Sequence, residues 1–333
     1  MSKLDLDIQK ISYLNDDTFQ ANHLHINFKG KSINHVVLNT LRRIMLEDIP
    51  CLSFNSELIE IIKNSSVYNN DYMRNRLENL PLININFKLD LDEYDILRKY
   101  TRGTKSYEEN LEVKDEEAED VKTESFFTMY CKKRNDKDII LDITSDDVEF
   151  YNQEKRINTI YKNPILITKL KPHEEIEFTA KADKGIAMNN SRYAVVGACC
   201  YELINENEFI LKFEPRGQLA VKEILLRSFT LIKFRLQQIL NKINKIKFTS
   251  DNHGKIILNN EDHTFGNLIA RGLQDHKSIE FAGYKLEHLL IRDVLIEYVT
   301  NGGKSINEIL KDVLLDYIKL YENIEVQINK LIN

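Results

Sequence analysis

The pattern of hydrophobic and polar positions near the start of the chain predicts a strand followed by a helix. Residues 24–28 alternate hydrophobic and polar side chains, which is the period of a strand with one buried face. Hydrophobic residues then recur every three or four positions, which predicts an amphipathic helix that Ser32 could cap and that Pro50 ends. The order is then repeated, with a predicted strand at 52–62 and a predicted short helix at 71–80.

From about residue 86 the pattern changes. Residues 108–124 are rich in Asp and Glu and poor in hydrophobic residues, which is typical of a solvated, mobile loop, the alternative being an acidic binding tail. Short candidate strands follow, separated by turn-forming residues. They are residues 126–131, 139–143, 165–170, 176–182 and 193–203. The middle third is therefore predicted to be a β-rich inserted domain.

Two long segments carry hydrophobic residues at heptad spacing. Residues 215–246 contain no helix breaker after Gly217, and residues 305–331 open with a capping box formed by Ser305 and Glu308. Both predicted helices need an apolar partner, and each could be the other's. The positions expected to form this dimerisation seam are Leu225, Phe229, Ile232 and Leu236 in the first helix and Leu310, Val313, Tyr317 and Leu320 in the second.

Two short segments in different halves of the chain resemble each other. Residues 34–45 read NHVVLNTLRRIM, and residues 262–273 read DHTFGNLIARGL. The identities are His35 with His263, Asn39 with Asn267, and Arg43 with Arg271. A shared amphipathic pattern could produce a few such identities by chance. However, each copy also follows a predicted strand, precedes another, and belongs to a half that ends in a long heptad helix. We interpret the two halves as related modules.

Composition limits the possible functions. With 333 residues, 42% of them hydrophobic, the chain can bury a core in each of two or three compact parts. A net charge of -6 argues against a basic surface that contacts DNA directly. No signal peptide or membrane-spanning segment is predicted. The cysteines lack metal-binding spacing, so we expect reduced thiols and no metal at Cys51, Cys131, Cys199 and Cys200. No catalytic motif is found either, and no cofactor is expected.

Two motifs resemble a known family. Residues 39–50, NTLRRIMLEDIP, are similar to a helix motif of the bacterial RNA polymerase alpha subunit and of its relatives, the third-largest eukaryotic polymerase subunit and the archaeal counterpart of that protein. Residues 67–82 continue that match. Residues 261–268, EDHTFGNL, and 280–284, EFAGY, are similar to the small alpha-like partner, which is the eleventh polymerase subunit in eukaryotes and has its own archaeal counterpart. The chain therefore resembles a fusion of two subunits that are separate in cells.

The resemblance implies an α+β fold with two alpha-like dimerisation modules paired through their long helices. Residues 1–85 and 205–250 would form the first module, residues 86–204 the inserted domain, and residues 251–333 the second module. Several family members hold a zinc or iron–sulfur cysteine cluster in the inserted domain, but no CxxC occurs here, so no metal is predicted. The DNA-binding C-terminal domain of the bacterial alpha protein has no counterpart in this sequence.

The function implied by the resemblance is structural. The paired modules would form a non-catalytic assembly platform that docks the largest and second-largest subunits of a DNA-directed RNA polymerase, with small subunits nearby and DNA met only through the complex. The implied partner-binding residues are Asn39, Arg42, Arg43, Glu47, Arg76, Lys184 and Arg271. The first helix, with its double arginine, is expected to be the main docking surface. Gly272 in the second helix is expected to allow close packing.

Two other classes of function remain open. A free-standing coiled-coil adaptor would use the heptad helices for self-association, and an uncharacterised enzyme would need a polar cluster in a pocket. Fusion of the two modules, together with richness in Lys, Asn and Ile, resembles large DNA viruses that transcribe in the cytoplasm. A viral protein of this kind would lie in the host cytoplasm and the virion, and a cellular one in the nucleus.

Overall fold

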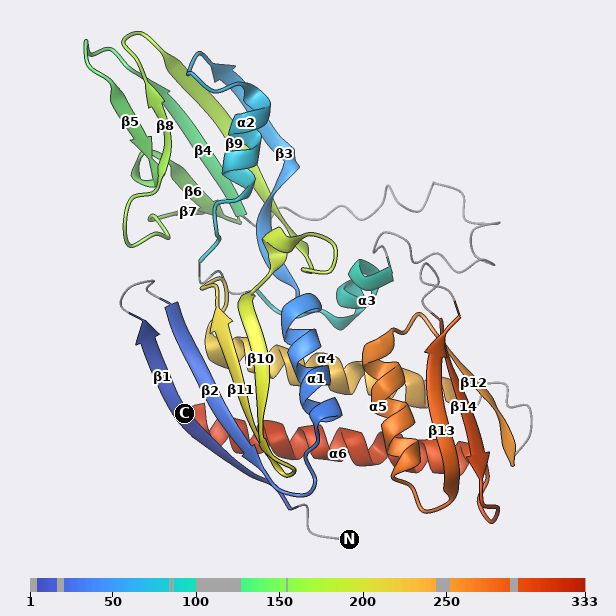
Figure 1. Cartoon of the computed structure of the whole chain (residues 1–333). Helices are drawn as coiled ribbons and strands as arrows, with labels where there is room; N and C mark the ends of the chain where they lie inside the picture. The colour runs from blue at the N-terminus through green and yellow to red at the C-terminus, as the bar shows by residue number, and fades with distance from the viewer. Residues whose placement is uncertain are drawn as a thin grey trace, which may run out of the picture.

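The computed structural model describes residues 5–16, 21–83, 85, 87–99, 127–153, 155–243, 252–287 and 293–332. Helices and antiparallel sheets are arranged in three parts, which confirms the predicted α+β class (Figure 1). The predicted acidic loop at 108–124 lies outside the described residues.

The first module contains a four-stranded antiparallel sheet and two helices. The strand order is β1 (Asp7–Asp16), β2 (Ala21–Lys29), β11 (Glu208–Pro215) and β10 (Val196–Asn205). Helices α1 (His35–Glu47) and α4 (Val221–Lys242) complete it. The inserted domain was predicted to extend to residue 204, whereas β10 pairs with β11 in this sheet. Helix α4 begins later than predicted, because Gly217 adopts a φ of 91° and Ala220 is the N-cap.

The second module repeats this plan with fewer strands. Its antiparallel sheet has the order β12 (His253–Asn259), β14 (Asp293–Thr300) and β13 (Ile279–Leu286). Helix α5 (His263–Gln274) packs on this sheet. Helix α6 (Ile306–Ile332) confirms the predicted second heptad helix and extends from this module to β1 of the first (Figure 1).

The insert is the remaining β-rich part and has a core of its own. Its larger sheet has the order β3 (Cys51–Asn64), β9 (Glu175–Gly185), β4 (Phe127–Arg134), β6 (Glu149–Asn152) and β7 (Lys155–Ile157), and β5 (Leu141–Thr144) pairs with β8 (Leu166–Leu170). Helix α2 (Asn70–Glu78) packs on β3. The sequence did not predict β6 and β7.

The boundary between the first module and the insert differs from the predicted one. Residues 52–85 were assigned to the first module, but Leu52, Met73 and Leu77 are buried in the core of the insert. The physical reason is that β3 pairs along most of its length with β9 of the insert. Helix α2 follows β3 and packs on it, so α2 also belongs to the insert. The first hydrophobic core takes only Cys51 from β3.

Helix α3 (Leu91–Lys99) was not predicted. It follows the insert residues in sequence but lies beside the two modules (Figure 1). The Asp90 carboxylate accepts hydrogen bonds from the backbone N–H groups of Asp92 and Glu93, at 2.9 and 3.2 Å, and so caps its first turn. Its buried residues, Tyr94 and Arg98, are four apart and lie on one face of the helix.

One hydrophobic core runs through both modules. Helices α4 and α6 pack against each other, and all eight predicted seam positions are buried. At Gly272 of α5, a Cβ atom would lie only 2.5 Å from Val313 and 2.6 Å from Tyr317 of α6. This glycine therefore permits the close packing of α5 on α6, as predicted.

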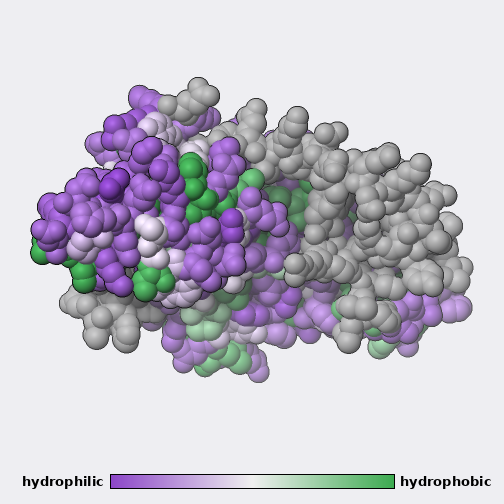
Figure 2. Space-filling view, turned by 90° about the horizontal axis from the view of Figure 1, so that it is seen from above, coloured by the Kyte–Doolittle hydropathy of each residue, from purple (hydrophilic) through white to green (hydrophobic). Residues whose placement is uncertain are grey.

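The face of the molecule at the insert end is mainly polar (Figure 2). Viewed from the insert end, the described surface is largely hydrophilic, with small separate hydrophobic patches (Figure 2). None of the helices in the described part of the chain is both long enough and apolar enough to cross a membrane.

Candidate functional site: the junction between the modules

Helix α1 brings the double arginine to the junction. Asn34 caps it by accepting a hydrogen bond from the backbone N–H of Val37 at 3.0 Å, so the helix starts two residues later than a Ser32 cap would allow. One face of α1 packs on β10, α4 and α5. Its remaining face carries partly exposed polar residues, and we call this the α1 docking face after the role expected for it from the sequence. Its members are Asn39, Arg42, Arg43 and Glu47.

Arg43 connects the docking face to the second module. Its Nε donates to the Thr264 hydroxyl of α5 at 2.7 Å, and its Nη2 donates to the Glu47 carboxylate at 3.0 Å. The Arg43 side chain remains 29% exposed. Its neighbour Arg42 donates to the Asn39 side chain at 3.0 Å. Burial, only partly offset by Arg43, raises the pKa of Glu47, with further raising contributions from Asp48 and Asp262.

A buried ionic cluster lies below this surface. Arg235 of α4 is 1% exposed and donates to the Asp48 carboxylate at 2.7 Å and to the Glu261 carboxylate. Its guanidinium also stacks 3.9 Å from the centre of the Phe265 ring. Asp48 ends α1, and Glu261 immediately precedes the N-cap of α5. One arginine therefore connects α4 with both repeated helices.

Helix α3 completes the cluster. The Tyr94 hydroxyl donates to Asp48 at 3.0 Å, and Arg98 donates to the Asn260 carbonyl at 2.6 Å and to Glu261 at 3.1 Å. We call Asp48, Tyr94, Arg98, Arg235 and Glu261 the junction cluster. Because its carboxylates and guanidiniums bond to one another, the charges compensate inside the protein. The cluster therefore joins the first module, the second module and α3.

Electrostatic coupling at the junction shifts proton affinities. Burial alone would raise the pKa of Asp262, but Arg235 and the hydrogen bonds from Thr264 outweigh burial, and the net shift is downward. Burial and the Asp48 carboxylate both raise the pKa of Tyr94. Burial alone would lower the pKa of Arg235, but the carboxylates of Glu261 and Asp48 outweigh burial, and the net shift of the pKa is upward. All three groups therefore keep their usual charge at neutral pH.

The long helices add further contacts between the modules. The Tyr321 hydroxyl of α6 donates to the Val37 carbonyl of α1 at 3.0 Å, and both groups are buried. Lys233 of α4 pairs with Glu325 of α6 at 2.5 Å. Thus α6 binds the start of α1, as α4 binds the start of α5.

The other predicted partner-binding residues lie apart from the docking face. Arg271 pairs with Asp275 on its own helix at 3.0 Å and is 43% exposed. In the insert, Arg76 donates to the carbonyls of Ile167 and Leu166 at 2.9 and 3.0 Å. Lys184 is largely buried and pairs with Glu93 of α3 at 2.6 Å. Arg76 and Lys184 thus hold elements of this chain together.

Sequence reasoning missed the junction cluster. Arg235 precedes the seam residue Leu236 and was not singled out, and Glu261 was noted only as part of a motif at a helix start. One signal in the sequence could have indicated that this arginine is buried. It lies next to a seam position, in a helix whose hydrophobic face was expected to be covered by the second long helix. Its partners could not be identified, because Asp48 lies 187 residues away.

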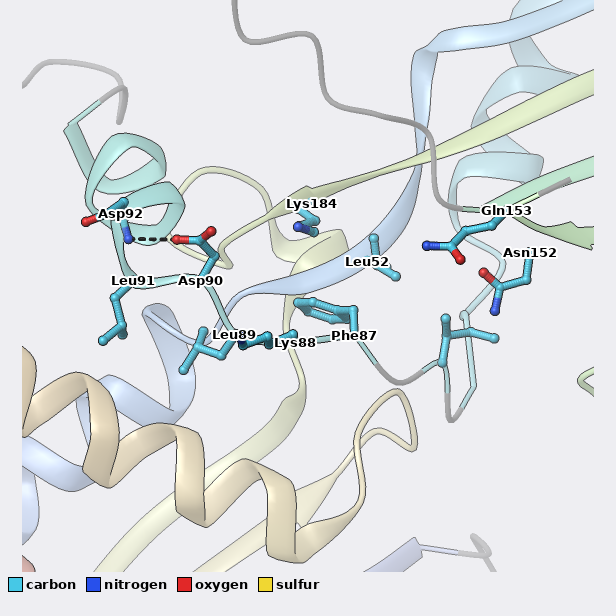
Figure 3. Close-up of a pocket in the computed structure, with 11 residues that line it drawn as sticks. Leu52, Phe87, Lys88, Leu89, Asp90, Leu91, Asp92, Asn152, Gln153 and Lys184 are labelled. Atoms are coloured by element: carbon cyan, nitrogen blue, oxygen red, sulfur yellow. Dashed lines mark hydrogen bonds between the residues drawn. The ribbon is translucent and has the colours of Figure 1, made fainter.

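A cavity with a volume of about 680 Å³ lies between the insert and α3. Figure 3 shows Leu89 and Leu91 at the end near α3 and Asn152 and Gln153 at the other end, with Phe87 and Leu52 of β3 between them. Two of its polar groups have structural roles, since Asp90 caps α3 and Lys184 pairs with Glu93. Elsewhere in the described residues, no three His, Cys, Asp or Glu side chains form a group that could hold a metal ion.

Two α+β units that pair through helices define a dimerisation protein, and comparison with known proteins identifies the family. Residues 253–327 match the RNA polymerase Rpb3/Rpb11 dimerisation domain. DNA-directed RNA polymerase subunit Rpo11 of Sulfolobus acidocaldarius is 33% identical over 79 residues, which cover 24% of this chain and 83% of that protein. The chain belongs to the RNA polymerase Rpb3/Rpb11 family of subunits.

Two longer relatives match almost the whole chain. A putative DNA-directed RNA polymerase subunit of Acanthamoeba polyphaga mimivirus is 29% identical over 322 residues, covering 92% of this chain and 90% of that protein. Subunit rpac1 of DNA-directed RNA polymerases I and III of Dictyostelium discoideum is 23% identical over 338 residues, covering 96% and 87%. The similarity therefore includes the first module and the insert as well as the second module.

Proposed function

We propose that this protein is the assembly platform of a multisubunit DNA-directed RNA polymerase and that it docks the two large subunits without taking part in catalysis. The observation that carries the proposal is the junction itself, where two modules share one core and present the partly exposed α1 docking face. The family membership and the polymerase names of the relatives support it.

The two modules have different parts in this proposal. The first module, with its double arginine, corresponds to the alpha-like protein, and the second corresponds to its small partner. The insert is an additional domain. We further propose that both modules of one chain pair with each other, since a short connection gives an effective concentration on the order of millimolar. An obligate homodimer with exchanged halves would contradict this part of the proposal.

The expected partners are the second-largest subunit at the α1 docking face, the largest subunit near Arg271, and small polymerase subunits. DNA would be contacted only through the complex. The mimivirus relative favours the viral alternative, for which the expected location is the cytoplasm of an infected cell and the virion, whereas a cellular protein would lie in the nucleus.

The coiled-coil adaptor is the weaker alternative. Self-association through the heptad helices would require exposed seam residues, but the described seam is buried, with Phe229, Ile232 and Leu236 each 0% exposed. The helices already use these faces to hold the two modules together.

Affinity purification of the tagged full-length protein tests the proposal. We expect the wild-type protein to recover two very large chains with polymerase activity, and Arg43→Ala to reduce their recovery. Arg156→Ala is a matched control, because this arginine also pairs with a glutamate at 3.0 Å but lies on the insert and is 67% exposed. Normal recovery with a folded Arg43→Ala protein would refute the assigned role of the docking face.

A further inference from the structure

A threonine of the second module holds an arginine of the first. Thr264 lies in the first turn of α5 and is 4% exposed. Its backbone N–H donates to the Asp262 carboxylate at 2.8 Å, which fixes the start of the helix. Its hydroxyl accepts the hydrogen bond from Arg43 Nε at 2.7 Å. The backbone that carries the acceptor is therefore held by a contact within the second module.

The two bonds of Arg43 fix the orientation of its guanidinium. Nε is held by Thr264 and Nη2 by Glu47, and a planar group bonded at two nitrogens cannot rotate without breaking one bond. Glu47 belongs to the same helix as Arg43 and is present whether or not the modules are paired. Thr264 is the contact that depends on pairing.

The repeat shows that this contact occurs on one side only. The alignment of residues 34–45 with 262–273 places Val36 opposite Thr264 and Arg271 opposite Arg43. Valine has no hydroxyl to accept a hydrogen bond. Arg271 bonds instead to Asp275 of its own helix, at 3.0 Å from Nε. Of the two arginines that the repeat aligns, Arg43 is held from across the junction and Arg271 is held within its own module.

We propose that Thr264 is a positioning residue for docking: it holds Arg43 in place across the junction, so that the α1 docking face is fully formed only when both modules are paired. This inference rests on the proposed docking function. It makes pairing of the modules a condition for large-subunit binding.

The test compares Thr264→Val, which keeps the shape but removes the hydroxyl, with Thr264→Ser, which keeps the hydroxyl. The first measurement uses the isolated full-length protein and follows hydrogen exchange of the Arg43 Nε–H by NMR with labelled arginine. A hydrogen bond with a charged donor corresponds to roughly tenfold or more in an equilibrium constant. We expect Thr264→Val to exchange about tenfold faster and Thr264→Ser to resemble the wild type.

The second measurement is recovery of the large subunits by the same tagged variants. We expect reduced recovery with Thr264→Val and restored recovery with Thr264→Ser. A folded Thr264→Val protein with a protected Nε–H, or with normal recovery, would overturn the inference. If Arg43→Ala lost recovery while Thr264→Val kept it, only the positioning role would fail. If Arg43→Ala also kept recovery, the proposed docking function itself would fail.

A second variant keeps the test decisive if Thr264→Val does not fold. Arg43→Lys retains the positive charge, but a single ammonium does not reproduce the fork that bonds Thr264 and Glu47 together. We expect this variant to fold and to recover less of the large subunits than the wild type. Full recovery by Arg43→Lys would show that orientation by Thr264 does not matter.

Discussion

Replacing Arg235 by methionine should strongly destabilise the paired modules. Arg235 is 1% exposed, and its partners Asp48 and Glu261 have side chains that are 2% and 6% exposed. Methionine has a similar length, so the change removes the charge with little loss of volume. Two carboxylates then remain buried with one cation fewer. Removing one partner of a buried ion pair costs about 3–5 kcal/mol, and we expect a loss in that range.

Urea unfolding of the full-length protein measures this effect. The chain has no tryptophan, so tyrosine fluorescence and circular dichroism would report the transition. Because the insert has a core of its own, its unfolding need not shift with that of the modules. The matched control is Arg271→Met, whose ion pair with Asp275 is about half exposed, with side-chain exposures of 43% and 50%. Such a pair contributes less than about 1 kcal/mol.

The pH dependence gives a second check. The folded-state pKa of Asp262 is lowered: burial opposes the shift, but Arg235 outweighs it. A lowered folded-state pKa contributes stability above the unfolded-state pKa, and this stability is lost as the pH falls. Without Arg235 that contribution is absent. The part of the stability difference between wild type and Arg235→Met that comes from Asp262 should therefore be constant from pH 7 to about pH 4 and shrink as the pH falls further. A variant within about 1 kcal/mol of the wild type at pH 7, like the control, would refute the reasoning.

Three further predictions concern packing, thiols and the helix contact. Gly272→Ala should destabilise by about 1–2 kcal/mol in thermal unfolding, since the clash with Val313 outweighs the better helix propensity of alanine. Native alkylation at pH 8, read by mass spectrometry, should modify the exposed Cys200 and spare the other thiols until unfolding. Burial raises the pKa to about 12 for each of the spared residues, Cys51, Cys131 and Cys199. Tyr321→Phe should cost about 1–2 kcal/mol in urea unfolding, since it leaves the buried Val37 carbonyl without this bond.

The helices of the two modules were predictable because their hydrophobic spacing is set by the surface they cover. The seam, the repeated helices and Gly272 were found in this way. Helix α3 was not, because nine residues with two buried positions give a weak periodic signal. The strand β10 was predicted as part of the insert but pairs with β11 in the sheet of the first module, since a period of two identifies a strand but not its neighbour.

The site was predictable in part. Arg42 and Arg43 could be recognised as polar residues outside a hydrophobic stripe, and the structure leaves both partly exposed. Sequence could not show that Lys184 is bonded to Glu93 or Arg76 to β8, because a cation in the sequence does not reveal its partner. The same limit hid the contact between Arg43 and Thr264, which are 221 residues apart.

The junction cluster also explains why unlike modules pair. The repeat places Ile33 and Asn34 at the positions of Glu261 and Asp262. If two first modules paired, Arg235 would keep Asp48 but would face an isoleucine and an amide in place of two carboxylates. A buried guanidinium with less compensating charge is costly, whereas the hydrophobic seam alone would tolerate either pairing. Arg235 therefore favours a second module as the partner of the first.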